Sequence, residues 1–452
     1  MSTATTAYRF DTQRVRAGYE PKEHNYAVSP PIYQTAAYDF RDVENAKNLF
    51  NLSEEGNLYT RIGNPTVAVL EQRVAALDGA SAAIALSSGM AAISYTLLNL
   101  AEGGGRILTS PYLYGGSDDS FKKVYPKFGI EFDYAKNIDN PEKLAEEIKP
   151  DTKAIYIESI SNPNTVLLDV DAIAKVAHDH GIPLVVDNTV ATPYLYRPIE
   201  HGADIVVYSA TKGLNGHGNL IAGLILESGK FDWEGSGRFP HFGEKYYTLR
   251  DPETEANRSY LEVFPDYPFT TRVRLNYLNY FGAALGPFDA YLAVIGLETL
   301  SERLGKQSFN AAAIADYLNA HNSVEWVRYP ALRSSPYHDR YKRDFKNGAG
   351  GLLAFGFKGT QEERETFLNS VKLLHYHVNI GDARTLIVNS PQTTHGELTV
   401  DEKAAVDIPE NLIRISAGLE DVADLIADLE QAFQRAAGTG VGFEPALQRA
   451  AG

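Results

Sequence analysis

Residues 170–187 have the sequence VDAIAKVAHDHGIPLVVD, and this stretch decides the fold class. Within Val170–His180, the apolar residues recur at the spacing of one helix face, at Val170, Ile173, Ala174 and Ala177. Leu184–Asp187 is a short apolar run that suits a buried strand. A helix followed directly by a buried strand is the repeating unit of an α/β protein with a parallel sheet.

The same alternation extends to both sides of this stretch. Further short apolar runs predict strands at Ala82–Leu86, Arg106–Thr109, Ala154–Glu158 and Asp204–Tyr208. Helical segments separate these strands, so we expect a mostly parallel sheet with both faces covered. Residues 1–65 show no clear period and predict an extended arm with short helices.

The C-terminal half contains a second predicted unit. A polar, aromatic insertion at about Phe231–Phe269 interrupts the alternation. A long helix at Pro287–Leu304 is then expected to lead into a second α/β unit that ends with the helix Asp421–Ala437. We therefore expect an arm (1–65), a large domain (66–285), a small C-terminal domain (286–437) and a tail (438–452), with Gln434–Gly438 repeated at Gln448–Gly452.

Composition and charge narrow the possible functions. The 452 residues, 44 % hydrophobic and 22 % charged, are typical of a soluble globular protein. No apolar run is long enough to cross a bilayer and no leader begins at Met1, so we expect a cytoplasmic protein. A net charge of −16 argues against nucleic acid and anionic membranes as partners.

The side-chain inventory also argues against a metal site. Without cysteine, the chain has no disulfide, thiolate nucleophile or Cys-zinc site. No H-E-x-x-H motif is present, and the pairs His178 with His180 and His375 with His377 are more typical of structural or solvated histidines.

Small and polar residues follow the predicted strands, at the sheet edge where α/β proteins bind ligands. Ser87–Met90 follows the first strand and opens a helix at Ala91–Leu100, so its N–H groups suit a phosphate, although an ordinary helix cap is the alternative. Tyr114 follows the second strand and could stack on a flat ring or pack on its own domain. Asn162 follows the third and could donate to a ring hydroxyl or occupy a turn before proline.

The last two predicted strands of this group end in more specific residues. Asp187 closes a buried apolar strand, where a carboxylate has to be paired, bind a metal, hold a cation or cap the next turn. A protonated pyridine nitrogen is such a cation. Lys212 follows the strand Asp204–Tyr208, and beside Ser209 and Thr211 it could form an imine while the two hydroxyls hold a phosphate. A solvated surface lysine is the alternative for Lys212 alone, but the combination of these strand ends is much more specific than any one of them.

These motifs together resemble the Cys/Met-metabolism family of pyridoxal-phosphate (PLP) enzymes, a branch of fold type I. The resemblance runs from about Gly18 to Ala437. The matching stretches are Tyr59–Thr66 (YTRIGNPT), Ser88–Ala92 (SGMAA), Ser161–Pro163 (SNP), Asp187–Thr189 (DNT), Ser209–Lys212 (SATK) and Arg414–Asp421 (RISAGLED). The family implies a large domain with a mostly parallel seven-stranded sheet, a smaller C-terminal α/β domain, and pyridoxal 5'-phosphate as cofactor.

The resemblance also implies a role for each matching residue. Lys212 would be the Schiff-base lysine and proton shuttle, Asp187 the partner of the pyridine nitrogen, Tyr114 the stacking ring and Asn162 a contact of the ring oxygen. The phosphate would be held by Ser88, Gly89, Met90, Ser209 and Thr211, with Tyr59 and Arg61 from a neighbouring subunit. Arg414 would bind the substrate carboxylate, with Asn379 and Tyr59 also in the substrate site. A homodimer would be the minimum active unit, and a homotetramer is expected.

Several stretches resemble the O-acetylhomoserine sulfhydrylase branch in particular. They are Gly18–Pro21, Ala27–Thr35, the insertion opening at Phe231–Trp233 with Ser236–Pro240, and Asn379–Arg384. Gly116 stands where methionine lyases carry a reactive cysteine, which counts against that activity. The implied reaction is replacement of acetate on O-acetyl-L-homoserine by sulfide or methanethiol, giving homocysteine or methionine in sulfur amino-acid synthesis.

Departures from the family pattern leave other activities open. Gly213 follows the lysine where the family favours a bulky aromatic residue, and Val388–Pro391 replaces an Ile-His-Pro-Ala type of sequence. The alternatives are a cystathionine γ-synthase or lyase, a sulfhydrylase that uses O-succinylhomoserine, and, in a different class, an inactive structural or regulatory family member.

Overall fold

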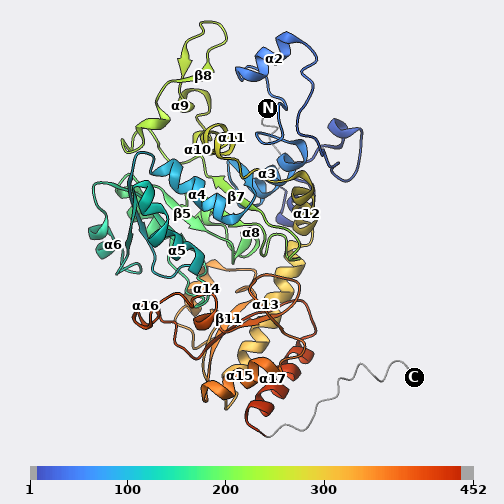
Figure 1. The fold of residues 1–452 in the computed structure, drawn as a ribbon, viewed down its shortest axis with the longest axis vertical. Helices are drawn as coiled ribbons and strands as arrows, with labels where there is room; N and C mark the ends of the chain where they lie inside the picture. The colour runs from blue at the N-terminus through green and yellow to red at the C-terminus, as the bar shows by residue number, and fades with distance from the viewer. Residues whose placement is uncertain (1–7, 439–452) are drawn as a thin grey trace. The chain divides into compact units, whose positions relative to one another are not determined.

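The computed structural model describes residues 8–438. Residues 439–452 of the predicted tail, including the Gln448–Gly452 repeat, lie outside the described residues. The chain divides into two compact units (Figure 1), formed by residues 8–161 with 167–302 and by residues 162–166 with 303–438. The domain boundaries given above stay predictions.

The first unit is built on a seven-stranded sheet in the order β1-β7-β6-β5-β4-β2-β3. Its strands are β1 (Ala82–Leu86), β2 (Gly105–Thr109), β3 (Ile130–Tyr134), β4 (Thr152–Glu158), β5 (Leu184–Asp187), β6 (Ile205–Ser209) and β7 (Gly223–Glu227). The neighbouring strands from β3 to β6 are parallel, and β7 runs antiparallel to β6 and β1. The expected mostly parallel seven-stranded sheet is confirmed.

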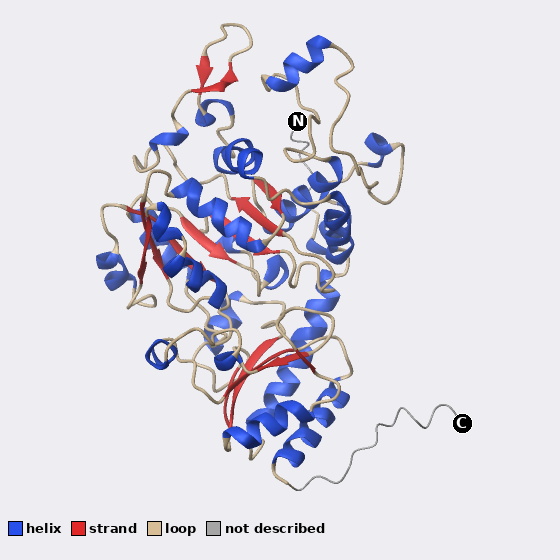
Figure 2. Ribbon diagram, viewed as in Figure 1, coloured by secondary structure: helices blue, strands red, loops and turns tan. Residues whose placement is uncertain are grey.

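Helices surround this sheet in the first unit (Figure 2). They are α1 (Phe10–Arg16), α2 (Val43–Phe50), α3 (Pro65–Asp78), α4 (Gly89–Leu100), α5 (Gly115–Lys123), α6 (Pro141–Glu147), α7 (Val170–Asp179), α8 (Thr192–Leu195), α9 (Tyr260–Val263), α10 (Pro268–Arg272), α11 (Asn279–Phe281) and α12 (Pro287–Leu297). Helix α4 packs on β6 and β7, α7 on β5, and α3 on β1. The central strands are therefore largely buried, which explains why most of their residues are apolar.

Two strands of the sheet were not among those predicted from the pattern. The strand β3 lies at the sheet edge, and its Glu131 and Asp133 break the apolar run. The strand β7 is apolar but follows a glycine-rich loop without a preceding helix. Because β7 is antiparallel to its neighbours, it needs no helical crossover, and the helix–strand alternation could not predict it.

The aromatic insertion belongs to the core of the first unit. Trp233, Phe239, Phe242 and Phe269 are buried, and Trp233 stacks on Phe269 with ring centroids 5.4 Å apart. Beyond the buried part, β8 (Tyr246–Arg250) and β9 (Asn257–Arg258) form a small hairpin. The insertion thus supplies buried aromatic area as well as a surface extension.

The single helix predicted at Pro287–Leu304 is wrong, because two helices occupy this range. Helix α12 ends at Leu297, and α13 (Leu300–Asn319) begins three residues later. The N–H groups of Glu298 and Thr299 bond to carbonyls three residues earlier, which tightens and ends the last turn of α12.

The second unit has a five-stranded sheet in the order β10-β11-β14-β13-β12. These strands are β10 (Val324–Arg328), β11 (Leu352–Phe357), β12 (His375–Tyr376), β13 (Leu386–Val388) and β14 (Leu412–Ser416), and the helices after α13 are α14 (His338–Asp344), α15 (Gln361–Ser370), α16 (Val400–Ala405) and α17 (Val422–Ala436). Apolar residues of α13, α15 and α17, such as Ile314, Phe367 and Leu429, form one core with the buried strand β11. The expected C-terminal α/β unit and its final helix are present.

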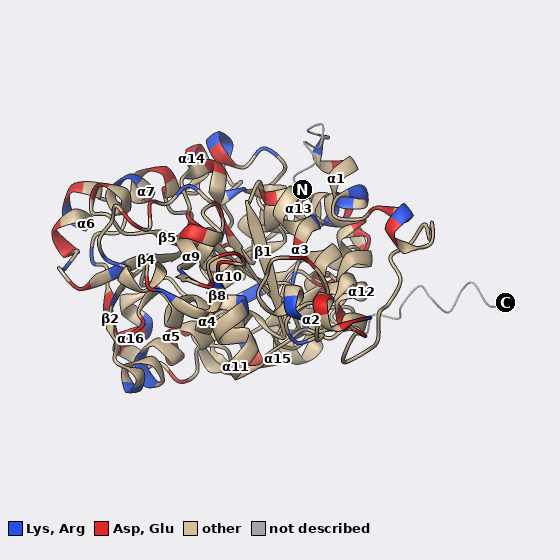
Figure 3. Cartoon of the chain, turned by 90° about the horizontal axis from the view of Figure 1, so that it is seen from above, with Lys and Arg blue, Asp and Glu red and all other residues tan. Residues whose placement is uncertain are grey.

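Charged residues of both signs are interspersed on the surface helices of the first unit. In Figure 3, α6 and α7 each contain acidic and basic residues. In the part of the chain that the structure describes, no helix is long and apolar enough to span a membrane.

Candidate active site

The start of α4 lies directly against the end of β6. Ser88 caps the helix, and its Oγ accepts a hydrogen bond of 3.1 Å from the N–H of Ala91. The N–H groups of Gly89 and Met90 belong to the first helical turn, which has no carbonyl four residues earlier within the helix. A Cβ on Gly89 would lie only 2.7 Å from the Cβ of Ser209. The glycine therefore allows the first-turn N–H groups and the Ser209 strand end to meet, which makes a site suited to an anion.

Hydrogen bonds link Ser209 to the neighbouring strand end. The N–H of Ser209 donates to Oγ1 of Thr189 (2.8 Å), and the N–H of Thr189 donates to Oδ1 of Asp187 (3.0 Å). The hydroxyl of Thr211 exchanges hydrogen bonds with the backbone of Ala222, just before β7. The predicted phosphate contacts of Ser209 and Thr211 stay predictions, but both residues lie on this edge of the sheet.

Asp187 is a half-buried carboxyl at the end of β5. Besides Thr189, the hydroxyl of Tyr156 approaches its Oδ2 at 3.3 Å. Burial raises the pKa of Asp187, while the hydrogen bonds from Thr189 and Tyr156 act in the opposite direction. A carboxylate in such surroundings is best satisfied by a nearby cation. Asp187 therefore accepts a hydrogen bond from the turn that follows it, and its predicted pairing with a cationic ring nitrogen stays a prediction.

Tyr114 and Asp187 are connected through Glu158. Glu158 is buried and lies beside Asp187 in the register of β4 and β5. Its Oε1 accepts a hydrogen bond from the backbone N–H of Tyr114, the residue before α5. The Tyr114 ring folds back over Gly116, where an added Cβ would lie 2.6 Å from the ring. A side chain at position 116, such as the cysteine of methionine lyases, would displace this ring.

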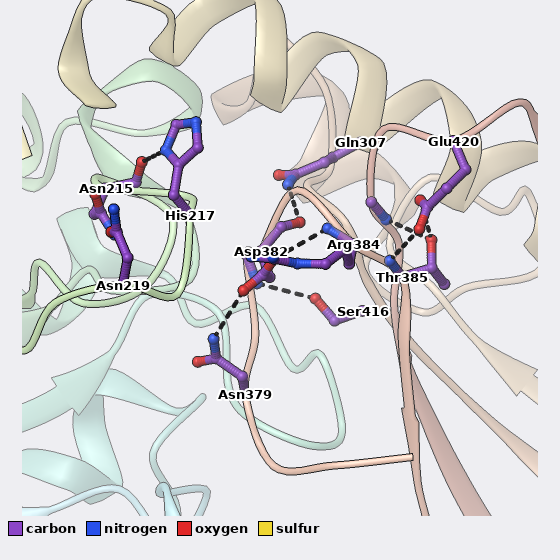
Figure 4. A network of polar contacts seen from close by, with 12 residues as sticks. Asn215, His217, Asn219, Gln307, Asn379, Asp382, Arg384, Thr385, Ser416 and Glu420 are labelled. Carbon is purple, nitrogen blue, oxygen red and sulfur yellow. Dashed lines mark hydrogen bonds and ion pairs between the residues drawn. The ribbon is translucent and has the colours of Figure 1, made fainter. Parts of the chain in front are cut away.

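Lys212 lies in the turn that follows β6 and is half-buried. Its N–H donates to the carbonyl of Ser209 (3.1 Å), and its own carbonyl accepts from Gly216 (2.8 Å). The turn continues through Asn215 (Figure 4), whose carbonyl is bonded to Nδ1 of His217 and whose Nδ2 donates to Oδ1 of Asn219. One chain of contacts thus joins Gly89, Ser209, Thr189 and Asp187, and Lys212 bonds into it at Ser209.

The structure explains the unusual glycine after the lysine. A Cβ on Gly213 would lie 2.9 Å from Cγ2 of Thr192. Thr192 is fully buried and has φ of +58°, a left-handed conformation that a β-branched residue rarely adopts. Thr192 is thus held in place beside the lysine turn, and it leaves no room for the bulky residue that the family favours.

Three further predicted site residues, Arg414, Asn162 and Asn379, lie in the second unit. Arg414 is buried on β14 and donates from Nη1 to Oδ1 of Asn162 (2.9 Å) and from Nη2 to the carbonyl of Asn379 (3.0 Å). Asn162 is thus bonded to Arg414, and its predicted contact with a ring oxygen stays a prediction. Its amide nitrogen is a separate donor that this bond does not use.

Tyr59 and Arg61 lie on the surface of the first unit. The guanidinium of Arg61 is 5.2 Å from the centre of the Tyr59 ring and 3.4 Å from Oδ1 of Asn279. Tyr59 is exposed, as are Tyr26 and Val28 of the same arm. Their predicted role in a neighbouring subunit stays a prediction.

Sequence reasoning missed three residues of this edge, namely Thr189, Tyr156 and Glu158. Thr189 was quoted only as part of a motif, although a hydroxyl two residues after a buried acid is a common turn partner. Tyr156 and Glu158 alternate with apolar residues in β4. A polar group inside a buried strand is a signal that could have identified them.

The two histidine pairs lie in different surroundings. Among the described residues, no group of three or more metal-ligating side chains is found. His178 bonds to Asp204 (2.8 Å), and this hydrogen bond raises the pKa of His178. His375 and His377 are exposed side chains at β12.

A second buried acid, Asp78, is linked by hydrogen bonds to the residue that follows Asp187. The carboxyl of Asp78 on α3 is fully buried and accepts a hydrogen bond from the hydroxyl of Tyr208. The same hydroxyl accepts from Nδ2 of Asn188 (2.8 Å), the residue after Asp187. Burial raises the pKa of Asp78 from 3.8 to about 7.

We expect Asp78→Asn to flatten the pH dependence of stability. Between pH 4 and 7 the folded protein binds more protons at Asp78 than the unfolded chain does. The free energy of unfolding therefore falls as pH rises, by up to about 1.4 kcal/mol per pH unit for one group. Asparagine keeps an oxygen for Tyr208 but does not titrate. Urea unfolding between pH 5 and 8 should show the variant gaining on the wild type as pH rises, and equal slopes would contradict the prediction.

The chain is similar to known proteins along most of its length. A family model described as Cys/Met metabolism PLP-dependent enzyme matches residues 11–434. A homocysteine synthase of Schizosaccharomyces pombe is 43 % identical, covering 94 % of this chain and 98 % of its own, and O-acetyl-L-homoserine sulfhydrylase 1 of Thermus thermophilus is 41 % identical, covering 94 % and 99 %. A Campylobacter jejuni crystal structure, described as a proposed O-acetylhomoserine (thiol)-lyase with a pyridoxyl-lysine monophosphate, matches with a TM-score of 0.89 and 36 % identity over 94 % of this chain and 100 % of that one. The fold type expected from the resemblance is confirmed.

Proposed function

The chain belongs to the Cys/Met metabolism family of PLP-dependent enzymes, and on that premise we propose that it replaces the acetate of O-acetyl-L-homoserine by sulfide. The product is homocysteine, and methanethiol in place of sulfide gives methionine. The Cγ–O bond of the ester breaks, acetate leaves with the electron pair, and sulfur forms a bond to Cγ. The proton of the thiol is released to solvent or acetate, so the reaction needs no oxidant or reductant.

The single observation that carries the proposal is the connected edge of the first unit. Its first-turn N–H groups at Gly89 and Met90 and the adjoining Ser209 fit a phosphate. Burial raises the pKa of the half-buried Asp187, and a cationic ring nitrogen beside it would stabilise its ionised form. Lys212 follows in the adjacent turn. These residues fit pyridoxal 5'-phosphate, which when bound supplies a carbonyl for covalent attachment and a ring that stores electrons.

The residues of this edge then have distinct tasks. The amine of Lys212 holds the cofactor covalently between turnovers and moves the proton at Cα of the substrate. The carboxylate of Asp187 keeps the ring nitrogen protonated. The Tyr114 ring would stack on the cofactor, and the backbone N–H of Tyr114 donates to Glu158. Thr211, with Ser88, extends the phosphate site.

In the second unit, Arg414 binds the α-carboxylate of the amino-acid substrate. A guanidinium is a planar, permanently charged donor that matches a carboxylate with two parallel hydrogen bonds. The hydrogen bonds to Asn162 and Asn379 end on neutral oxygen atoms, so they orient the guanidinium without neutralising its charge. Asn379 adds a side-chain amide to the same region, and Asn162 donates to the ring oxygen of the cofactor.

The thiol of this reaction comes from the second substrate. The chain has no cysteine, and Gly116 leaves the Tyr114 ring in place where methionine lyases carry a cysteine. Replacement of acetate is therefore favoured over lyase chemistry.

The protein acts as a homodimer at minimum, with a homotetramer expected and a cytoplasmic location. Tyr59 and Arg61 reach the phosphate of the neighbouring subunit, and Tyr59 also contacts its substrate. The arm exposes apolar residues, among them Tyr26 and Val28, which supports the proposal that a second subunit covers this surface. Light scattering of the purified protein tests the assembly, and a monomer with full activity would contradict it.

We expect a substrate panel to separate the proposed activity from its rivals. The holoenzyme is incubated with O-acetyl-L-homoserine or O-succinyl-L-homoserine, each with sulfide, methanethiol, cysteine or no nucleophile. Mass spectrometry should detect homocysteine as the main product of the acetyl ester with sulfide. Cystathionine as the main product, a preference for the succinyl ester, or 2-oxobutanoate without a nucleophile would each overturn the proposal.

A further inference from the structure

We propose that Asp382 is a positioning residue that sets the orientation of Arg414 through the loop Asn379–Asp382. The inference rests on the proposed role of Arg414 as the site of the substrate carboxylate. It adds a residue that touches neither substrate nor cofactor. All of the residues involved belong to the second unit.

The guanidinium of Arg414 is held at one side by backbone. Its Nη2 donates to the carbonyl oxygen of Asn379 at 3.0 Å, while Nη1 donates to Asn162. A backbone carbonyl moves only when its loop moves. The position of the loop at Asn379 therefore decides where this edge of the guanidinium points.

The carboxylate of Asp382 is hydrogen-bonded to residues on both sides of it in that loop. Its side chain is buried, and its Oδ2 lies 3.3 Å from Nδ2 of Asn379 (Figure 4). Its Oδ1 accepts hydrogen bonds from the backbone N–H (3.0 Å) and Nε (2.8 Å) of Arg384. Although burial acts to raise the pKa of Asp382, the hydrogen bonds from Arg384 hold that pKa below its ordinary value. The carboxylate thus ties both ends of the turn together.

The loop is also anchored on the strand that carries Arg414. The N–H of Gly381 donates to Oγ of Ser416 at 3.0 Å. Ser416 lies two residues after Arg414 on β14, and residues two apart point to the same face of a strand. From the other side, Nε2 of Gln307 donates to the carbonyl of Asp382 at 2.8 Å. The loop is therefore clamped to the face of β14 from which the arginine projects.

Arg384 is not itself the carboxylate site in this arrangement. Its side chain is 55 % exposed, and its Nε is already bonded to Asp382. Its task is to hold the Asp382 carboxylate in one orientation, so that the second oxygen faces Asn379.

We expect Asp382→Asn to weaken substrate binding without loss of cofactor. The asparagine must present its NH2 group either to Arg384 or to the amide nitrogen of Asn379, and in both cases two donors face each other. The Michaelis constant for O-acetyl-L-homoserine and the dissociation constant for L-norleucine, measured by calorimetry, should each rise about tenfold, as for the loss of one charged hydrogen-bond arrangement. The absorbance of the bound cofactor and kcat should change less than about threefold.

Three comparisons separate positioning from a general effect on folding. Asp316→Asn makes the same charge change on the exposed face of α13 and should leave both constants unaltered. n-Pentylamine, which lacks the carboxylate, should bind equally weakly to the wild type and to Asp382→Asn. In an Arg414→Lys background, Asp382→Asn should add less than about threefold, because coupled residues are not additive.

The outcomes distinguish the inference from the function on which it rests. A lower melting temperature with wild-type constants per folded site would make Asp382 merely structural and overturn the inference. Additive effects in the double variant would overturn it as well. If the wild type neither binds the cofactor nor turns over the ester, the proposed function fails, whereas an active wild type with an unaffected variant refutes only the role of Asp382.

Discussion

Lys212→Ala should give a folded protein whose turnover is lower than that of the wild type by about 100- to 10,000-fold, the range that a positioned proton-transfer group contributes. Alanine removes the only proposed covalent link to the cofactor and the amine that moves the Cα proton. The fold should persist, since alanine keeps the backbone hydrogen bonds that this residue makes to the carbonyl of Ser209 and from the N–H of Gly216. The measurement is steady-state turnover of O-acetyl-L-homoserine with sulfide, alongside the absorbance of the cofactor.

A chemical experiment tests the same residue without turnover. Borohydride treatment of the wild-type holoenzyme should add the mass of the reduced cofactor to the peptide that contains Lys212. The same treatment of Lys212→Ala should leave that peptide unmodified. Lys127→Ala removes an exposed lysine of the same unit and should behave as wild type in both assays. Full turnover by Lys212→Ala, or labelling of another lysine in the wild type, would remove Lys212 from the mechanism.

The fold could be predicted from the sequence where helices alternate with buried, apolar strands. The strands β1, β4 and β5 were expected to within two residues, because each contains a short run of buried hydrophobic residues. The strand β3 was missed because Glu131 and Asp133 interrupt its apolar run, and β7 was missed because an antiparallel strand needs no crossover helix before it. The end of α12 was missed because it depends on two backbone hydrogen bonds rather than on proline or glycine.

The sequence could predict which residues belong to the candidate site, but not the hydrogen bonds that those residues make. Strand-end logic identifies Asp187 and the Ser209–Lys212 segment, since the ends of neighbouring parallel strands meet at one edge. The bond between Arg414 and Asn162 joins residues 252 positions apart, and no local pattern signals it. Asp382 looks like an ordinary turn residue in the sequence. Only the loop geometry shows that its two oxygens connect Arg384 with the residue whose carbonyl holds Arg414.

Asp187→Asn should make the cofactor-free protein more stable and the holoenzyme less active. Burial raises the pKa of Asp187 in the folded protein, so without cofactor the folded state binds a proton there more readily than the unfolded chain. Stability from this group is then lost as pH rises through the folded pKa. Asparagine does not ionise, and its oxygen can accept from Thr189. The cofactor-free variant should therefore be more stable than the wild type at pH 8, and this advantage should shrink toward acidic pH.

The holoenzyme should respond in the opposite direction. The amide cannot hold a proton on the ring nitrogen, so kcat for the ester with sulfide should fall by about 100-fold or more, as for loss of a charge partner at a reacting group. Cofactor affinity should fall as well, which equilibrium dialysis against pyridoxal phosphate measures. Asp266→Asn, on the surface of the same unit, serves as the charge-matched control. A variant with wild-type kcat would show that Asp187 does not face the ring, and an unstable cofactor-free variant at pH 8 would show that its carboxylate supports the strand ends rather than awaiting a cation.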